Sequence, residues 1–428
     1  MNIKRITVVT TMALALAGGA SPAIASDAEI NALREQLTAL GARLDQLEAS
    51  NRELRQTNAQ LRASGEKTAA AVADVSEKTT AVAAQVKESS GASSWTDNIK
   101  LKGDFRMRHE SIAEEGKSTR KRDRVRARAA IVAQVNSDLE VGIGMASGGD
   151  DPVSTNQTLG GGGSTKGLNL DLAYFNWSGL ENTSIVGGKF KNFLYKPGKN
   201  SLLWDGDWNP EGLGLVWADG DYFASAMGTW LESDNKKETE FSYGLQFGFN
   251  KELSEGVKLT AGIGYYNLST RGNGSFYGDD DDFFGNSFDS ATNTYLFDYE
   301  ELELFADLGF SIGEKPAALF LDFVQNQDAS AFDTGYAVGF KYGSSSSAGG
   351  SQFSVTYQDL ERDAVFGLLT DSDFAGGGTD GTGYILKGAY GIAKNWTAGI
   401  TYFITERDAN KGSPRDYDRL QVDMAMKF

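Results

Sequence analysis

The last stretch of the chain alternates between apolar and polar side chains and ends on an aromatic residue. Its apolar positions are Leu420, Val422, Met424, Met426 and Phe428, and the positions between them are Arg419, Gln421, Asp423, Ala425 and Lys427. This period of two residues predicts a β-strand whose two faces meet different surroundings. A strand of this kind that closes the chain on an aromatic residue is typical of a transmembrane β-barrel, with lipid outside and water inside.

The same alternation extends over residues 97–428. Residues 99–107 and 125–135 show it, with mostly basic or polar side chains at the positions that would face inward. Short turns alternate with long loops, and the long loops fall at residues 147–167, 269–299, 361–382 and 406–415. Short turns at one end and long loops at the other are typical of an outer-membrane barrel. We therefore predict an all-β, antiparallel transmembrane barrel of about 16 strands. A secreted soluble all-β protein is the alternative.

A period of seven residues organises residues 26–87. Leu occupies every d position as far as residue 61, and the a positions hold Ile, Leu or Asn. This pattern predicts an α-helical coiled coil. The predicted core positions are Ile30, Leu33, Leu37, Leu40, Leu44, Leu47, Asn51, Leu54, Asn58 and Leu61. The narrow apolar stripe requires an identical partner, and Leu at d with Asn at a suits a dimer as well as a trimer.

Two further segments flank the coiled coil. Residues 1–25 contain Lys4 and Arg5, then an apolar stretch, then the small-residue sequence Ala-Ile-Ala. This order predicts a cleaved secretory signal, and a membrane-anchoring helix is the alternative. Residues 88–96 are rich in Ser and Gly and predict a flexible linker before the barrel. Export would place the coiled coil in the periplasm, where residues 30–86 would span roughly 85 Å as a helix.

Composition and charge narrow the class of protein. The 428 residues include 51 Gly and 6 Pro, which suits long closed sheets, and no Cys, which excludes disulfides. The net charge is −17, and basic residues are concentrated in one segment alone. A nucleic-acid partner requires an extended basic surface, so none is predicted.

Three short motifs resemble a known family. The sequence GKFKN at residues 188–192 is followed by LWDGD at 203–207 and PEG at 210–212. With the coiled coil and the terminal Phe428, they make the whole mature chain resemble a Gram-negative "putative porin" family of single-chain outer-membrane barrels. The resemblance implies a homotrimer. It also implies that the barrel-assembly machinery recognises Phe428 as a signal.

Two opposed sets of charges are candidates for the constriction of a pore. The basic set lies at inward-facing positions: Lys100, Lys102, Arg106, Arg108, Arg126, Arg128, Lys189 and Lys191. The acidic set, Asp205, Asp207 and Glu211, lies on the long connection after Lys191. If this connection folds into the lumen, the two sets create a transverse field across an eyelet, and such charges set selectivity. Two alternatives are that the basic residues hold the loop by salt bridges, or that these charges lie on outside-facing loops.

The sequence therefore predicts an outer-membrane porin that passes ions and small hydrophilic solutes by passive diffusion. One alternative is a tether between the outer membrane and peptidoglycan, with the barrel as an anchor of little conductance. A second is an adhesin that uses the loop at 269–299. His109, the only histidine, lies two residues from Ser111, but this spacing alone defines no nucleophile–base pair, so no enzyme activity is predicted. No cofactor or metal is predicted either.

Overall fold

The structure is a computed structural model that describes residues 98–233 and 239–428, together with positions 38, 41, 49, 50, 52, 55–57, 59, 60 and 62. The chain divides into two compact units, Met1–Ser93 and Ser94–Phe428. The described positions of the first unit are α-helical and exposed. The predicted signal (1–25), the ten coiled-coil core positions and the linker (88–96) lie outside the described residues and stay predictions. Among the described residues, no helix is long and apolar enough to cross a membrane.

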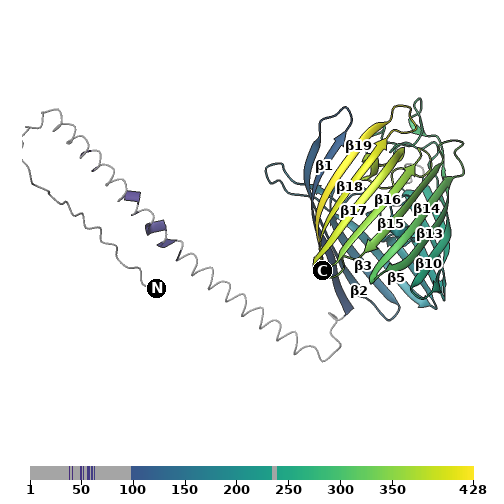
Figure 1. The fold of residues 1–428 in the computed structure, drawn as a ribbon, viewed down its shortest axis with the longest axis horizontal. Helices are drawn as coiled ribbons and strands as arrows, with labels where there is room; N and C mark the ends of the chain where they lie inside the picture. Colours follow the sequence, from purple (N-terminus) through teal and green to yellow (C-terminus); the bar gives the residue numbers. More distant parts are fainter. Residues whose placement is uncertain are drawn as a thin grey trace, which may run out of the picture. The chain divides into compact units, whose positions relative to one another are not determined.

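The second unit is a closed antiparallel barrel of sixteen long strands (Figure 1), which confirms the predicted fold class. The strands are β1 (Ile99–Glu114), β2 (Arg120–Gln134), β3 (Leu139–Ser147), β5 (Leu168–Leu180), β6 (Thr183–Lys189), β7 (Glu211–Asp219), β8 (Tyr222–Glu232), β9 (Glu240–Ser254), β10 (Val257–Leu268), β13 (Tyr299–Ile312), β14 (Lys315–Asn326), β15 (Thr334–Gly343), β16 (Ser351–Leu360), β17 (Gly381–Ala393), β18 (Trp396–Arg407) and β19 (Arg415–Lys427). Each pairs with the next along the chain, and β1 pairs with β19 to close the sheet.

Three short strands lie outside this series. β4 (Gln157–Thr158) pairs with β2 from within the connection between β3 and β5. β11 (Phe288–Asp289) and β12 (Thr294–Tyr295) pair with each other in a separate two-stranded sheet. All three belong to long loops, so they leave the sixteen-stranded wall unchanged.

The chain terminus is part of the closure between β1 and β19. Phe428 and Gly103 exchange two backbone hydrogen bonds, each 3.0 Å between N and O. The Phe428 ring lies over Gly103, where an added Cβ would come within 2.3 Å of ring atom Cζ. Glycine at position 103 therefore makes room for the terminal aromatic ring.

The alternation in the sequence separates the two faces of the wall. Leu101, Met107 and Val422 point outward and are 63%, 50% and 45% exposed. On the same two strands, Arg108 and Arg419 point inward and are buried. An apolar outer face and a charged inner face are the pattern of a barrel that spans a membrane.

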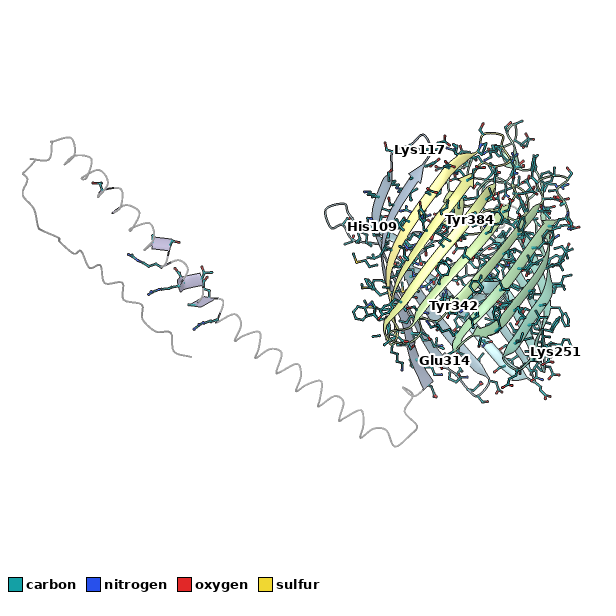
Figure 2. All side chains as sticks on the ribbon, in the orientation of Figure 1. His109, Lys117, Lys251, Glu314, Tyr342 and Tyr384 are labelled. Atoms are coloured by element: carbon teal, nitrogen blue, oxygen red, sulfur yellow. The ribbon has the colours of Figure 1, made fainter. Side chains whose placement is uncertain are left out.

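The two ends of the barrel differ in the length of their connections. Lys117 marks the end with the long loops, and Glu314 and Lys251 mark the end with the short turns (Figure 2). Two long loops, residues 190–210 and 361–380, contribute many of the most deeply buried side chains of the unit. We call them the 190–210 loop and the 361–380 loop.

An apolar cluster inside the barrel packs these loops together. It joins Leu202 and Trp204 of the 190–210 loop to Phe366 and Leu369 of the 361–380 loop, and to wall residues such as Val324. The rings of Phe276 and Tyr295 from residues 269–298 also pack on Phe366. Apolar side chains thus fill part of a lumen that the sequence predicted to be lined by charge.

Candidate functional site

The 190–210 loop crosses the lumen from β6 to the wall formed by β13 and β14. The Tyr195 hydroxyl donates to Asp307 over 3.2 Å, and the backbone N–H of Gly198 donates to the same carboxylate over 2.9 Å. Gly198 has a positive φ of 59°, and an added Cβ would lie 2.1 Å from Phe320 of β14. Only glycine satisfies both the backbone conformation and this close approach. The 190–210 loop therefore runs inward from β6 to the wall at β13 and β14.

The 361–380 loop meets the 190–210 loop inside the barrel. The backbone N–H of Asp205 donates to the carbonyl of Leu369 over 2.7 Å, and the Thr370 hydroxyl donates to the carbonyl of Leu202 over 2.7 Å. The N–H of Ser372 donates to the Asp205 carboxylate over 3.0 Å. The two loops therefore form one assembly.

The wall opposite Phe320 carries an ordered array of charges on β1 and β2. Four cross-strand pairs face inward in sequence: Asp104 with Arg128, Arg106 with Arg126, Arg108 with Arg124, and Glu110 with Arg122. The carboxylates stand at the two ends of the array and four arginines stand between them. We call these eight residues the arginine array.

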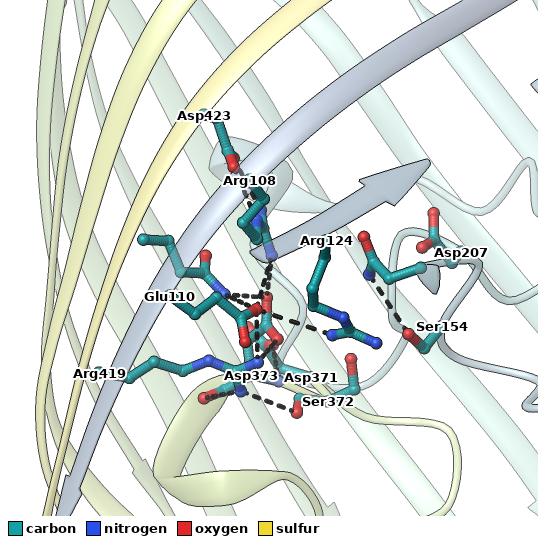
Figure 3. Close-up of polar contacts among 12 residues, drawn as sticks. Arg108, Glu110, Arg124, Ser154, Asp207, Asp371, Ser372, Asp373, Arg419 and Asp423 are labelled. Atoms are coloured by element: carbon teal, nitrogen blue, oxygen red, sulfur yellow. Dashed lines mark hydrogen bonds and ion pairs between the residues drawn. The ribbon is translucent and has the colours of Figure 1, made fainter. Parts of the chain in front are cut away.

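Glu110 holds one end of the array and is fully buried. It pairs with Arg122 of β2. It also pairs with Arg419 of β19 at 3.0 Å and with Arg108 at 3.7 Å (Figure 3). One carboxylate thus joins three strands on both sides of the barrel closure. A carboxylate placed among several arginines strongly favours its charged form.

Asp373 connects the 361–380 loop to the same place. Its carboxylate lies 3.1 Å from Arg108 and 2.8 Å from Arg419, and it accepts a hydrogen bond from Gln421 over 2.9 Å (Figure 3). Burial raises the pKa of Asp373, but Arg419 and Arg108 outweigh burial and hold that pKa well below its usual range. Arg108 also makes two bonds of 2.7 Å to Asp423 of β19. The ion pairs of Asp373 therefore anchor the 361–380 loop to β1 and β19.

Asp207 connects the 190–210 loop to the other end of the array. It lies 2.9 Å from Arg128 and 3.3 Å from Arg126, and both arginines also pair with Asp104. Burial raises the pKa of Asp207, yet Arg126 and Arg128 bring it below its usual value. The sequence predicted that Asp207 faces the basic wall across an open gap. The structure brings the two into direct contact, the arrangement expected of a salt-bridged tether.

Asp205 has a different environment from Asp207. Its carboxylate accepts backbone N–H bonds from Asp207 and Ser372 and is almost fully buried between the two inward loops. Burial, with the nearby charges of Asp371 and Asp207, raises its pKa to about 8. Asp205 therefore joins the two loops and does not line an open passage.

The remaining predicted residues lie apart from the array. Lys189 pairs with Glu211 at 2.7 Å across β6 and β7, and Lys191 lies 3.9 Å from Asp171 of β5. Lys189, Glu211 and Asp207 line a cavity of about 590 Å³.

Lys100 and Lys102 are exposed at the end of the barrel that carries the short turns. His109 lies on the outer side of β1 and pairs with Asp123 of β2 at 2.8 Å.

Several residues of the site were not predicted as such from the sequence. They are Glu110, Arg122, Arg124, Asp371, Asp373, Arg419 and Asp423. The sequence did contain a signal for Arg122 and Arg124. Arg occurs at every second position from 120 to 128, and this period places these five arginines on one face of a strand. The expected start of that strand at residue 125 was too late. No short-range pattern indicates that residues 361–380 return to the lumen.

Comparisons with known proteins agree with the barrel. A family model described as "putative porin" matches residues 111–276 and 286–428. No curated protein matches the chain. The chain is similar to the high-pH structure of OprB from Pseudomonas putida, with 12% identity, a TM-score of 0.52, and coverage of 78% of this chain and 95% of OprB. This likeness shows the fold alone.

Two further solved structures share less of the geometry. OmpF of Salmonella typhi, in complex with daunomycin, is 13% identical, with a TM-score of 0.49 over 78% of this chain and 99% of its own. A triple mutant of the Rhodopseudomonas blastica porin is 10% identical, with a TM-score of 0.46 over 77% of this chain and 100% of its own.

Proposed function

The chain belongs to the "putative porin" family, and we propose that it is an outer-membrane porin passing ions and small hydrophilic solutes by passive diffusion. The observation that carries the proposal is the arginine array on the inner wall of a closed barrel. Charged residues inside a membrane-spanning structure are costly, and they usually mark the path of an ion or a solute. We assign the protein a channel role rather than an enzymatic one.

The contacts of the inward loops support a constriction set by the array. Asp207 and Asp373 bring two loops against the same wall, so charge gathers where the lumen is narrowed. We propose that Lys100, Arg106, Arg108, Arg126 and Arg128 face the solute path, with Asp207 as the acidic partner. Lys189, Lys191 and Glu211 would then line the entrance to this path. Asp205 would affect the path indirectly, by holding the 190–210 and 361–380 loops together.

A second function is favoured by the apolar cluster. Leu202, Trp204 and Phe366 fill part of the lumen, as expected for a barrel that mainly anchors a tether and conducts little. Single-channel recording in planar bilayers with the full mature chain separates the two functions. Discrete ohmic steps in 1 M KCl are expected of a porin. Stable insertion without steps would support the anchor.

We propose further that residues 26–87 form a periplasmic coiled coil that joins three chains and spaces the barrel from peptidoglycan. The support is the run of Leu at d positions from Leu33 to Leu61. An isolated peptide of residues 26–64 should be helical only in the associated state, because a narrow apolar stripe is stable only when a partner covers it. Sedimentation combined with circular dichroism tests this, and a stable helical monomer would exclude the assignment.

A further inference from the structure

The centre of the arginine array places like charges directly opposite each other. Arg106 faces Arg126, and Arg108 faces Arg124 on the neighbouring strand. Like charges opposite one another destabilise a pair of strands. Diagonal neighbours across two strands, such as Arg106 and Arg124, have Cα atoms about 7–8 Å apart, within reach of long side chains. Four guanidinium groups therefore gather in a small part of the lumen.

Carboxylates compensate only some of these four arginines. Arg126 pairs with Asp104 and Asp207, and Arg108 pairs with Asp423 and Asp373. These two arginines are therefore neutralised by groups of the chain itself.

The other two arginines, Arg106 and Arg124, have fewer or longer carboxylate contacts. Among the described residues, no carboxylate lies within ion-pairing distance of Arg106, whose guanidinium donates instead to Asn156 over 2.7 Å. Arg124 has one carboxylate contact, 3.7 Å from Glu110, which is already held by Arg122 and Arg419. The Nε atoms of Arg106 and Arg124 are both buried and have no hydrogen-bond partner. The charges of Arg106 and Arg124 are thus less compensated than those of Arg108 and Arg126, and each has an unused Nε donor.

The loop between β3 and β5 completes the surroundings of these cations. Asn156 accepts from Arg106, and its side-chain N–H donates to the Ser154 hydroxyl over 3.3 Å. In Figure 3 the contact of Arg124 runs to Glu110, and Ser154 and Asp207 lie on the other side of Arg124 in this view. Amide and hydroxyl groups beside guanidinium forks can complete the hydrogen bonding of a small anion.

We propose that Arg106 and Arg124 form a binding subsite for oxyanionic solutes, that is, small molecules that carry a carboxylate or a phosphate. The guanidinium fork matches the paired oxygens of these groups, and a halide presents no such pair. A bound oxyanion would also relieve the repulsion between the facing arginines. The proposal rests on the porin function above and adds a class of solute to it.

Equilibrium dialysis of the folded, detergent-solubilised full chain tests the subsite without requiring conductance. The probes are radiolabelled succinate and inorganic phosphate, at a fixed ionic strength set with KF, which KCl replaces stepwise. We expect saturable binding of both probes that is not displaced by additional chloride. The double variant Arg106→Gln/Arg124→Gln should weaken binding by about tenfold or more, because the charge-assisted fork bonds are lost.

Two comparisons keep the result specific. Lys117→Gln/Lys121→Gln removes the same charge from exposed residues near the loop end of β1 and β2, and it should keep binding within about twofold of the wild type, because solvent and salt screen exposed charges. Arg106→Lys/Arg124→Lys keeps the charge without the fork and should bind weakly. The Gln variant removes like-charge repulsion, so it should fold at least as well as the wild type, which gel mobility without heating checks.

The outcomes distinguish this proposal from the porin function. Equal binding by the wild type and the Arg106→Gln/Arg124→Gln variant, or displacement by chloride, overturns the subsite even if the channel conducts. Loss of binding in that variant alone supports the subsite, whatever the bilayer recordings show. If the Lys117→Gln/Lys121→Gln control loses binding equally, the attraction is a general field and the subsite is wrong.

Discussion

The 190–210 loop meets two walls of the same lumen, and it is held differently at each. At β13 and β14, Gly198 packs on Phe320, and neutral donors such as Asn200 bond to buried carboxylates. At β1 and β2, Asp207 is held by two arginines. Apolar contact does not depend on the ionic medium, whereas ion pairs respond to salt, pH and a charged solute. The loop therefore has a fixed side, held by apolar and neutral contacts at β13 and β14. It also has an adjustable side, held by ion pairs at β1 and β2.

The carboxylates of the two walls show the same contrast. Glu303 accepts hydrogen bonds from the Tyr266 hydroxyl over 2.6 Å and from Gln246 over 3.2 Å, and no arginine or lysine within the described part of the chain is bonded to it. Glu110 is equally buried but is surrounded by arginines. A buried group bonded to neutral donors contributes rigidity, whereas a group within an ion network loses several interactions together when one member is removed.

The largest effect is expected at the centre of the charged wall. Glu110→Gln leaves Arg122 without a carboxylate partner among the described residues and leaves Arg419 with Asp373 alone, and breaking a buried ion pair costs about 3–5 kcal/mol. The variant should convert to the heat-unfolded form at a lower temperature, and its conductance should fluctuate as the 361–380 loop loosens. Gel mobility against temperature and bilayer recordings measure the two effects.

Lys117→Gln is the control for Glu110→Gln. Lys117 pairs with Glu114 at the exposed loop end, where an ion pair contributes about 1 kcal/mol or less. Unchanged melting of Glu110→Gln would mean that the arginines are stabilised elsewhere and that the charged wall is not an integrated network.

The fixed side can be tested by shortening one apolar side chain. Leu202 is fully buried between the two inward loops, and Leu202→Ala should cost about 2–5 kcal/mol through lost burial and the cavity left behind. The loss should be nearly the same at 0.1 M and 1 M KCl, because no charge is involved. A strong dependence on salt would remove the distinction between the two sides of the loop.

The sequence predicted the wall of the barrel better than its contents. Alternation has a period set by strand geometry, so 99–107 and the terminal strand ending at Phe428 could be assigned to faces without any long-range information. The position of the 361–380 loop depends on Asp373 meeting Arg108, a residue 265 positions away along the chain. Such contacts carry no local period, so a single sequence cannot show them.

The candidate site was predicted in part for the same reason. Arg106, Arg108, Arg126 and Arg128 were identified because basic residues alternate on two adjacent strands. The degree to which each would be neutralised was not predictable, because Asp104 and Asp423 differ from other aspartates only in their place in the fold. Two inward loops are tethered to the charged wall, and the least compensated part of that wall is Arg106 and Arg124.

A smaller effect should follow pH through Asp205. Its pKa of about 8, raised by burial and by Asp371 and Asp207, means that the folded state holds a proton that the unfolded state releases. This contribution to stability is complete below the ordinary aspartate pKa and is lost as pH rises toward 8, at up to about 1.4 kcal/mol per pH unit. The temperature at which the barrel converts to the heat-unfolded form should therefore fall from pH 6 to 8 in the wild type. It should change less over this range in Asp205→Asn. Parallel curves would place the titrating group elsewhere.

The smallest effect is expected in ion selectivity. Removing a negative charge from the constriction should favour anions, and Asp207→Asn removes one of the two that Arg126 and Arg128 share. The reversal potential in a KCl gradient at low ionic strength should therefore shift toward anion preference, while conductance changes little because the side chains are nearly equal in size. Asp205 is largely protonated at pH 7, so Asp205→Asn/Asp207→Asn should shift the potential no further than Asp207→Asn alone.

The matched control for selectivity lies in the outer loop at residues 279–282. Asp280 and Asp281 are exposed, so Asp280→Asn/Asp281→Asn removes more charge than Asp207→Asn, but from a well-screened position. It should move the reversal potential less than Asp207→Asn. An equal shift would place the selectivity of the pore in its vestibule, and the adjustable side of the 190–210 loop would then hold the loop in place without choosing the ion.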